Sequence, residues 1–125
     1  MESNWSAGQP IYRQLRDRVV AMMLDGALKE GDPLPSVRQV AAELRVNPLT
    51  VLKGYQELAD EELIEKRRGL GMFVRTGSRE VLLKDERERF LKEEWPHVFA
   101  RMRRLGIEPG ELLATANEGN GGAGR

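Results

Sequence analysis

The chain has 125 residues, the length of one small domain with an extension. It contains no cysteine, which excludes disulfide frameworks, thiolate zinc sites and thiol catalysis together and fits a reducing cytoplasm. Twenty basic residues balance twenty acidic ones, with 11 of each within residues 1–77 and 9 of each within 78–125, so any binding to a polyanion must use local clusters of charge.

Two features of the sequence argue against a membrane or secreted protein. No apolar run approaches the roughly 20 residues that a helix needs to cross a bilayer. The segment MESNWSAGQP lacks both the charged region and the apolar region of a signal peptide. We therefore expect a cytoplasmic protein without a membrane partner.

The first expected element is a helix within PIYRQLRDRVVAMMLDG, preceded by a flexible polar N-terminus at residues 1–9. Pro10 suits the first position of a helix, because its missing N–H would be unpaired there in any case. Gly26 can end the helix in a left-handed turn. Apolar side chains follow helical spacing between these two residues: Ile11, Leu15, Val19, Met22 and Met23.

Two short helices joined by a tight turn are expected within residues 34–58. Ser36 is a good N-cap for the first helix, and Gln39 three residues later completes a capping box. Asn47 caps the second helix, with Pro48 at its first position. The inward face of this second helix is formed by Val51, Gly54, Tyr55 and Leu58. Its outward face carries Leu49, Lys53 and Gln56, with Thr50 on the flank.

The sequence period changes after Glu62 from that of a helix to that of a strand. LIEKRR and MFVR are typical of two short strands, and RGLG lies between them as a hairpin turn. Gly69 and Gly71 supply the backbone freedom that such a turn needs. The expected order is therefore helix, helix, tight turn, helix, hairpin.

A charged helical arm is expected from Ser78 to residue 116, followed by a disordered tail at 117–125. Pro96 either opens a second helix or kinks one long helix, and Gly106 ends it. IEPGELLATA can form a last short helix. An arm of this size cannot form its own core, so its apolar stripe is expected to be an oligomer interface. The stripe contains Phe90, Trp95, Val98, Phe99, Met102 and Leu105.

These motifs, in this order and with these gaps, resemble one known family. LPSVRQVAAEL, VNPLTV, YQELADEELIE and the Gly-x-Gly hairpin are similar to the winged helix-turn-helix domain of GntR-type bacterial transcription regulators, over about residues 10–75. The short C-terminal part resembles the YtrA-like subfamily, which has about two further helices for dimerisation and no large effector domain. The resemblance implies that the helix led by Asn47 enters the major groove of DNA and the hairpin enters the minor groove.

The resemblance also implies a set of DNA-binding residues. Arg38 corresponds to an arginine of the family that reaches DNA, where a bidentate contact to guanine discriminates by roughly 1–3 kcal/mol. The other matching positions are Ser36, Asn47, Leu49, Thr50, Lys53, Arg67, Arg68, Gly69 and Gly71. Relatives often have a polar residue in place of Leu49. Leucine cannot hydrogen-bond a base but can contact a thymine methyl, so we expect an altered or A·T-leaning preference there.

Several of these residues have a purely structural interpretation. Ser36 and Asn47 can act only as helix caps, and KRR beside acidic residues can form surface ion pairs worth roughly 0–1 kcal/mol each. Tyr55 is expected in the core rather than as a platform for base stacking. The single histidine, His97, has no metal or nucleophile partner nearby in sequence. We find no phosphate-binding loop, catalytic triad or clustered metal ligands, so no enzyme, cofactor or metal is expected.

The sequence thus predicts a mainly α-helical protein with a small β-hairpin: a winged helix-turn-helix domain at 10–77 and a helical dimerisation arm at 78–116. The expected function is that of a bacterial DNA-binding transcription regulator. We expect a homodimeric repressor on an inverted-repeat operator, of its own operon or of an ABC transporter operon. Two alternatives stay open: a winged-helix module that binds protein, and a small-molecule sensor with an effector pocket between subunits.

Overall fold

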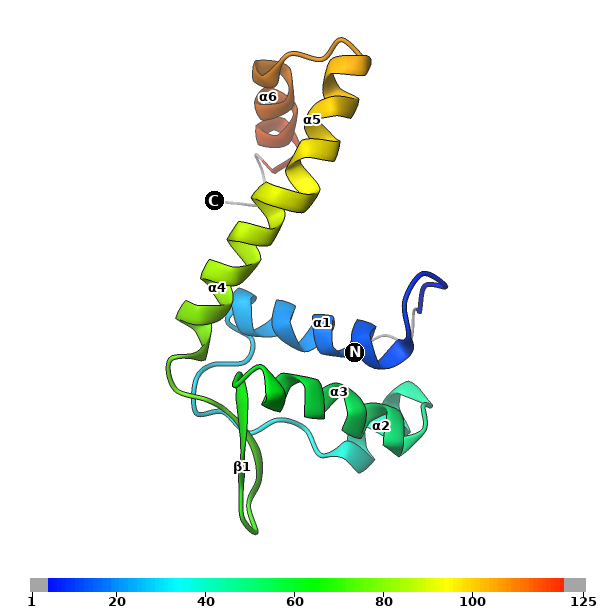
Figure 1. Ribbon diagram of the computed structural model, residues 1–125, viewed down its shortest axis with the longest axis vertical. Helices are drawn as coiled ribbons and strands as arrows, with labels where there is room; N and C mark the ends of the chain where they lie inside the picture. Colours follow the sequence, from blue (N-terminus) through cyan, green and yellow to red (C-terminus); the bar gives the residue numbers. More distant parts are fainter. Residues whose placement is uncertain (1–4, 121–125) are drawn as a thin grey trace. The chain divides into compact units, whose positions relative to one another are not determined.

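The computed structural model describes residues 5–120, which form two compact units divided between Lys84 and Asp85. The first unit holds α1 (Ile11–Asp25), α2 (Val37–Leu44), α3 (Pro48–Asp60), β1 (Ile64–Arg67) and β2 (Gly71–Val74), followed by the first turns of α4 (Ser78–Arg89) (Figure 1). The helical fold with one antiparallel hairpin, and the order of its elements, confirm the predicted fold class. None of the helices within residues 5–120 is long and apolar enough to cross a membrane.

Local sequence signals set the ends of the first three helices. Pro10 immediately precedes α1, and Gly26 ends it with a φ of 86°. The Ser36 hydroxyl accepts a hydrogen bond of 3.1 Å from the Gln39 N–H and so caps α2. The Gln39 side chain donates to Glu43 at 3.4 Å instead of returning to Ser36, so only the first half of the predicted capping box is formed.

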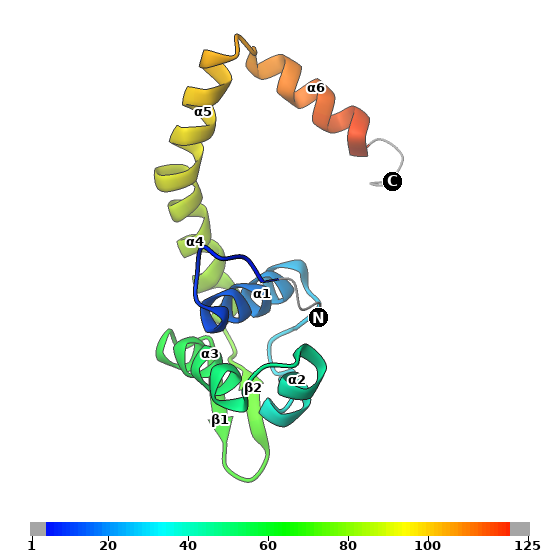
Figure 2. The ribbon, with the colours of Figure 1, turned by 90° about the vertical axis from the view of Figure 1, so that its right-hand side faces the viewer.

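The core of the first unit lies between α1, α2, α3 and the base of the hairpin. The backbones of α1 and α3 approach closely at Gly54, where an added Cβ would lie 3.0 Å from the carbonyl oxygen of Tyr12. Figures 1 and 2 show these two helices side by side. The largest fully buried side chains are Tyr55, Leu15, Met23, Leu44, Leu58, Val19, Val40, Val51 and Val74.

A buried arginine of α1 joins this helix to the C-terminal end of α3. Arg16 is 6% exposed, and its Nε donates to the Glu61 carboxylate at 2.8 Å, while a second guanidinium nitrogen donates to the other Glu61 oxygen. A third hydrogen bond of 2.9 Å goes to Asp17. Hydrogen bonding to Glu61 is the main cause that raises the pKa of Arg16 above its usual value, so the guanidinium stays charged. Glu61 therefore has a structural role.

The hairpin is held against the rest of the unit by the segment that precedes α2. Its strands pair antiparallel from Ile64 opposite Val74 to Arg67 opposite Gly71. The Leu34 N–H donates to the Met72 carbonyl at 2.8 Å, and the Val74 N–H donates to the Asp32 carbonyl at 2.8 Å. These bonds cover one edge of β2 and fix the base of the hairpin, while its tip projects from the unit (Figure 2).

The first turns of α4 belong to the first unit, although the expected boundary lies after residue 77. Ser78 is 3% exposed and Leu82 is 2% exposed. Leu82 packs within the same hydrophobic cluster as the three preceding helices. The Arg79 guanidinium also donates to the Leu24 carbonyl at 3.1 Å. The first compact unit therefore extends to Lys84, within α4.

The second unit begins within α4 and contains a π-helical turn (Phe90–Glu94), α5 (Trp95–Arg104) and α6 (Pro109–Asn120). The Trp95 N–H donates to the Phe90 carbonyl, a spacing one residue wider than in an α-helix. Pro96 has no N–H to donate to the Lys92 carbonyl, so the wider turn costs no hydrogen bond at that residue. Pro96 thus stands in the first turn of α5, directly after helical backbone.

The ends of the chain differ in part from expectation. Gln14 accepts a hydrogen bond from the Ser6 N–H at 2.8 Å and donates to the Gln9 carbonyl at 2.7 Å, so residues 6–9 fold back on α1. Trp5 packs against the core cluster. At the other end α6 continues to Asn120, past the expected start of the tail at 117. Residues 1–4 and 121–125 lie outside the described residues.

Candidate nucleic-acid interface

The turn between α2 and α3 brings two capped helices into one compact motif. Arg45 adopts a left-handed conformation with a φ of 55°, and the Val46 N–H donates to the Ala41 carbonyl at 3.1 Å. The Asn47 side chain then accepts a hydrogen bond of 2.9 Å from the Leu49 N–H. The Thr50 N–H donates to the Asn47 carbonyl at 2.9 Å and the Val51 N–H donates to it at 3.4 Å, so each backbone donor of the first turn has a partner. What this helix end offers an anion is the positive end of the helix dipole.

We define the reading face as four exposed side chains on the side of α3 that faces away from the core: Leu49, Leu52, Lys53 and Gln56. Leu49 is 70% exposed, an unusual exposure for a leucine at the N-terminal end of a short, well-packed helix. Thr50 lies half-buried on the flank, as its spacing predicts. Leu52 was not among the predicted contacts, although its position three residues after Leu49 places it on the same side.

Lys53 has a partner that the sequence gives no sign of. Its ammonium nitrogen lies 4.1 Å from the centroid of the Tyr12 ring, across the contact between α1 and α3. Tyr12 is half-buried and Lys53 is exposed. The Lys53 side chain therefore extends from α3 toward α1, and not toward the hairpin.

The predicted residues of α2 divide into a cap and an exposed cation. Ser36 is exposed, but its hydroxyl oxygen already accepts the capping bond from Gln39. Arg38 is exposed, and no hydrogen bond or ion pair joins its guanidinium to another residue within 5–120. Of these two residues, Arg38 is the one whose donors are available to a ligand.

The tip of the hairpin presents one arginine and one leucine to solvent. Gly69 and Gly71 have φ values of 77° and 107°, which only glycine adopts without strain. Leu70 between them is 72% exposed. Arg68 is exposed, and in the described part of the chain it has no ion-pair or hydrogen-bond partner. Leu70 was missing from the predicted site, although its place between two glycines marks it as the tip.

Arg67 differs from its neighbour because it is held along the strand. Its guanidinium lies 4.2 Å from the centroid of the Phe73 ring, and its Nη2 lies 3.4 Å from the Glu65 carboxylate. Both partners belong to the hairpin itself. The geometry therefore favours Arg68 over Arg67 as the residue that reaches beyond the hairpin.

Tyr55 lies in the core and not on the interface. It is 2% exposed, and its hydroxyl donates a hydrogen bond of 2.7 Å to the Pro35 carbonyl. Burial raises the pKa of Tyr55 from 10.0 to about 12. The residue therefore fixes α3 against the chain just before α2, and it offers no ring face for a base.

The second unit has a separate apolar surface, the arm face, formed by Phe90, Trp95, Val98, Phe99 and Leu105. The rings of Trp95 and Phe99 lie 5.7 Å apart, centroid to centroid, at an interplanar angle of 44°. Met102 was predicted to belong to this surface, but it is only 5% exposed. His97 is exposed on the same helix.

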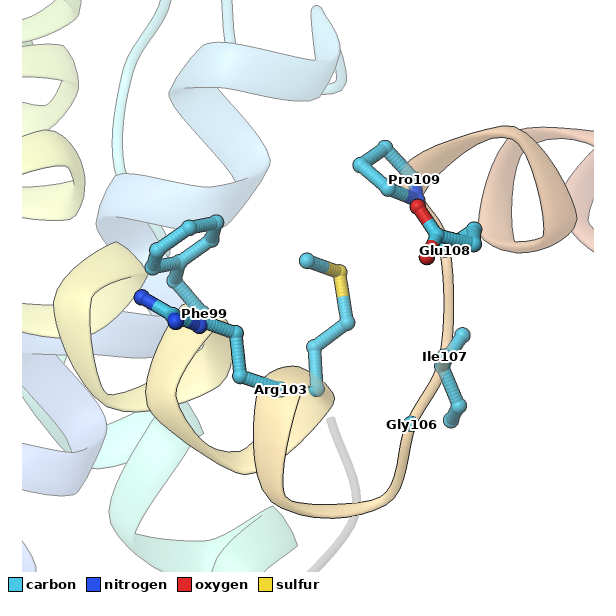
Figure 3. Close-up of a pocket in the computed structure, with 7 residues that line it drawn as sticks. Phe99, Arg103, Gly106, Ile107, Glu108 and Pro109 are labelled. Carbon is cyan, nitrogen blue, oxygen red and sulfur yellow. The ribbon is translucent and has the colours of Figure 1, made fainter.

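A cavity of about 320 Å³, the elbow cavity, lies where α5 turns into α6 (Figure 3). Phe99 and Arg103 reach it from α5, and Ile107, Glu108 and Pro109 line it from the connection. The Arg103 guanidinium lies 5.9 Å from the centroid of the Phe99 ring. Within residues 5–120, no group of three or more acidic, histidine or cysteine side chains is arranged to hold a metal ion.

Comparison with known proteins places these surfaces in context. Residues 11–74 match the family described as bacterial regulatory proteins, gntR family. The chain is 34% identical over 99 residues to the HTH-type transcriptional repressor YtrA of Bacillus subtilis, covering 79% of this chain and 75% of that protein. It is 29% identical over 113 residues to YhcF, an uncharacterized HTH-type transcriptional regulator of the same organism, covering 90% and 92%.

A solved structure agrees with the fold over nearly the whole chain. A GntR family transcriptional regulator from Listeria monocytogenes superposes with a TM-score of 0.73 at 28% identity. The match covers 91% of this chain and 98% of that one. The similarity therefore extends beyond the winged domain.

Proposed function

The chain belongs to the gntR family of bacterial regulatory proteins, as a YtrA-like transcription regulator with a DNA-binding helix-turn-helix domain, and on this premise we propose that it is a dimeric repressor that binds an inverted-repeat operator. One observation carries the proposal. The reading face of α3 is exposed beside an Asn47-capped helix end, although Leu49 and Leu52 are apolar. An uncovered surface of this kind is typical of a binding site.

In the proposed complex α3 lies in the major groove and the hairpin tip lies in the adjacent minor groove. The positive end of the α3 dipole lies against a phosphate and helps to set the register. Arg38, whose donors are unpaired within the described residues, contacts a guanine edge. Arg68 and Leu70 enter the minor groove, where basic side chains sense groove width and apolar ones contact the sugars or the base step.

The arm face supports the dimer. Five exposed apolar side chains on a helical arm are better covered by a second copy than by water, since each fully buried large side chain contributes roughly 1.5–3 kcal/mol. A two-fold dimer presents two reading faces in opposite directions, which matches an inverted repeat. We assign residues 10–77 to DNA binding and 78–116 to dimerisation, with the start of α4, which packs on the first unit, as the connection between them.

A bound dimer represses by occupying the promoter, in the cytoplasm where the bacterial chromosome lies. The similarity to a protein named as a repressor favours repression over activation. We propose that the target is its own operon or an operon for an ABC transporter. Induction then requires only a few kcal/mol of difference between two spacings of the winged domains.

Footprinting on the promoter of its own gene tests this proposal. We expect two protected half-sites related by inverted symmetry, with centres about one helical turn apart or at a spacing that the arm sets. Size-exclusion chromatography with light scattering should give a dimer in the absence of DNA. A strictly monomeric protein, or one that leaves every fragment of its upstream region unprotected at low ionic strength, contradicts the proposal.

Two other functions are distinguished by further measurements. A module that binds protein through the same face would show no steep fall of log affinity with log salt on DNA, whereas phosphate contacts require it. A small-molecule sensor is favoured by the elbow cavity, which has both an aromatic ring and a guanidinium in its lining. Thermal shifts on a metabolite panel, repeated with Arg103→Ala, test that candidate.

A further inference from the structure

Tyr12 contacts the reading face from α1, the helix that precedes the helix-turn-helix motif. The ammonium nitrogen of Lys53 lies 4.1 Å from the centroid of its ring. The face of an aromatic ring carries negative charge density and attracts a cation. We propose that Tyr12 is a positioning residue for DNA binding, whose ring holds the Lys53 ammonium where it meets a phosphate of the DNA backbone. The inference rests on the proposed function, in which α3 enters the major groove.

The backbone of Tyr12 is held in place by the close contact of α1 with α3. A Cβ on Gly54 would lie 3.0 Å from the Tyr12 carbonyl oxygen and 3.3 Å from the Leu15 side chain, so no larger residue fits without a shift. Gly54 directly follows Lys53 in α3. The packing of the two helices therefore sets the backbone of Tyr12 relative to that of Lys53.

The residues around Tyr12 add to this restraint. Gln14 joins the chain before α1 to the helix through three hydrogen bonds, two of 2.8 Å with Ser6 and one of 2.7 Å with the Gln9 carbonyl. One residue beyond Tyr12, Arg13 approaches the Glu57 carboxylate at 3.7 Å. The first turn of α1 is thus tied to its own N-terminal segment and to α3, which leaves the half-buried Tyr12 ring little freedom.

A positioned lysine binds a phosphate more readily than a free one. The lysine stem has four rotatable carbons, and ordering it on binding costs conformational entropy. A ring that already holds the ammonium reduces this cost before DNA arrives. Because the Lys53 ammonium lies on the α1 side of the reading face, we expect it to meet the sugar–phosphate backbone and not the base edges. Tyr12 should therefore affect affinity equally on all operator variants.

A double-mutant cycle on the full-length protein tests this role. The probe is a labelled duplex cut from the promoter of its own gene, titrated at several salt concentrations with Tyr12→Leu, Tyr12→Phe, Lys53→Ala and Tyr12→Leu/Lys53→Ala. We expect Tyr12→Leu to weaken binding by roughly two- to fivefold and Tyr12→Phe, which keeps the ring, to bind like the parent. Lys53→Ala should lower the salt slope by about one, and Tyr12→Leu should have no further effect on that background.

A second measurement uses only the parent protein, so it does not depend on whether a variant folds. In the free parent protein the proton resonances of the Lys53 ε-methylene should be shifted upfield by the ring, because a group above an aromatic face is shielded. Ordinary resonances there overturn the positioning role. The positioning role is also overturned if Tyr12→Leu has the same effect with and without Lys53. It is overturned as well if Tyr12→Leu has no effect while Lys53→Ala weakens binding. In each of these cases the proposed function stands. If Lys53→Ala changes neither affinity nor slope, both the positioning role and the assignment of Lys53 fail.

Discussion

The hydroxyl of Tyr55 donates a hydrogen bond of 2.7 Å to the carbonyl of Pro35, and this single bond joins α3 to the residue before the cap of α2. The bond helps to hold α3 against the segment that leads into α2. Its energy also depends on pH, because a phenolate cannot donate. Burial raises the pKa of Tyr55 from 10.0 to about 12 in the folded protein.

The first prediction concerns stability at alkaline pH. The unfolded chain loses the Tyr55 proton first, so the free energy of unfolding should fall as pH rises from 10.0 to about 12. The full shift corresponds to about 3 kcal/mol. Tyr55→Phe should cost about 1–3 kcal/mol at neutral pH, because it leaves the Pro35 carbonyl without its donor, and should remove this part of the pH dependence. Urea denaturation across the range, compared with Tyr12→Phe as the matched control, measures both effects.

Gly54 gives a second prediction about the same motif. Alanine in a helix is favoured over glycine by about 1 kcal/mol, but overpacking costs about 1–3 kcal/mol. The nearest atom to the added Cβ is the Tyr12 carbonyl oxygen at 3.0 Å, which cannot rotate away. We expect Gly54→Ala to lose about 1 kcal/mol of unfolding free energy overall.

Gly110 provides the control for that substitution. It also lies in a helix, yet an added Cβ would meet nothing within 4 Å. Gly110→Ala should leave the unfolding free energy unchanged or raise it. Chemical denaturation that finds Gly54→Ala as stable as the parent would show that α1 can move away from α3 at little cost.

The elements of the fold that the sequence predicts well are those that depend on neighbours in the chain. The Ser36 and Asn47 caps, the end of α1 at Gly26 and the hairpin turn between Gly69 and Gly71 all follow from local chemistry. The buried and exposed sides of α3 follow from helical periodicity in the same way. Local signals were therefore enough to place the motif.

The sequence does not predict contacts between residues that lie far apart in the chain. Arg16 and Glu61 are 45 positions apart, and only the packing of α1 on the end of α3 brings them together. The Tyr12–Lys53 contact depends on the same packing. Met102 followed the apolar period of the arm, but periodicity does not tell whether a side chain is covered by its own unit or by another copy.

The two neighbouring arginines of the hairpin should differ in DNA binding, which is a third prediction. Arg67 is held by Phe73 and Glu65, whereas Arg68 has no such partner among the described residues. Arg68→Ala should weaken binding on all sequences alike and lower the salt slope by about one. Arg67→Ala, the matched control, should change affinity less. A larger effect of Arg67→Ala would reverse the assignment.

Arg38 and Leu49 should instead affect which base is preferred. Arg38→Ala should cost about 1–3 kcal/mol of discrimination at one position in each half-site. Leu49 is 70% exposed and can offer only apolar contact, so Leu49→Asn should shift preference away from thymine at its position. Binding to a library of operator variants measures both, and unchanged preference at every base for Leu49→Asn contradicts the predicted contact.

The arm face gives the last prediction, on assembly. Val98 belongs to this face, so Val98→Glu places a charge where a second copy should pack, and an unpaired buried charge is costly. Ala100 lies two residues along α5, on the opposite side of the helix, and is exposed. Ala100→Glu introduces the same charge without touching the arm face. We expect Val98→Glu to be monomeric in sedimentation experiments and to bind a single half-site with the parent's base preference, while Ala100→Glu remains a dimer. A dimeric Val98→Glu variant would place the interface elsewhere, since an interface with an unpaired carboxylate at its centre does not keep the same contact.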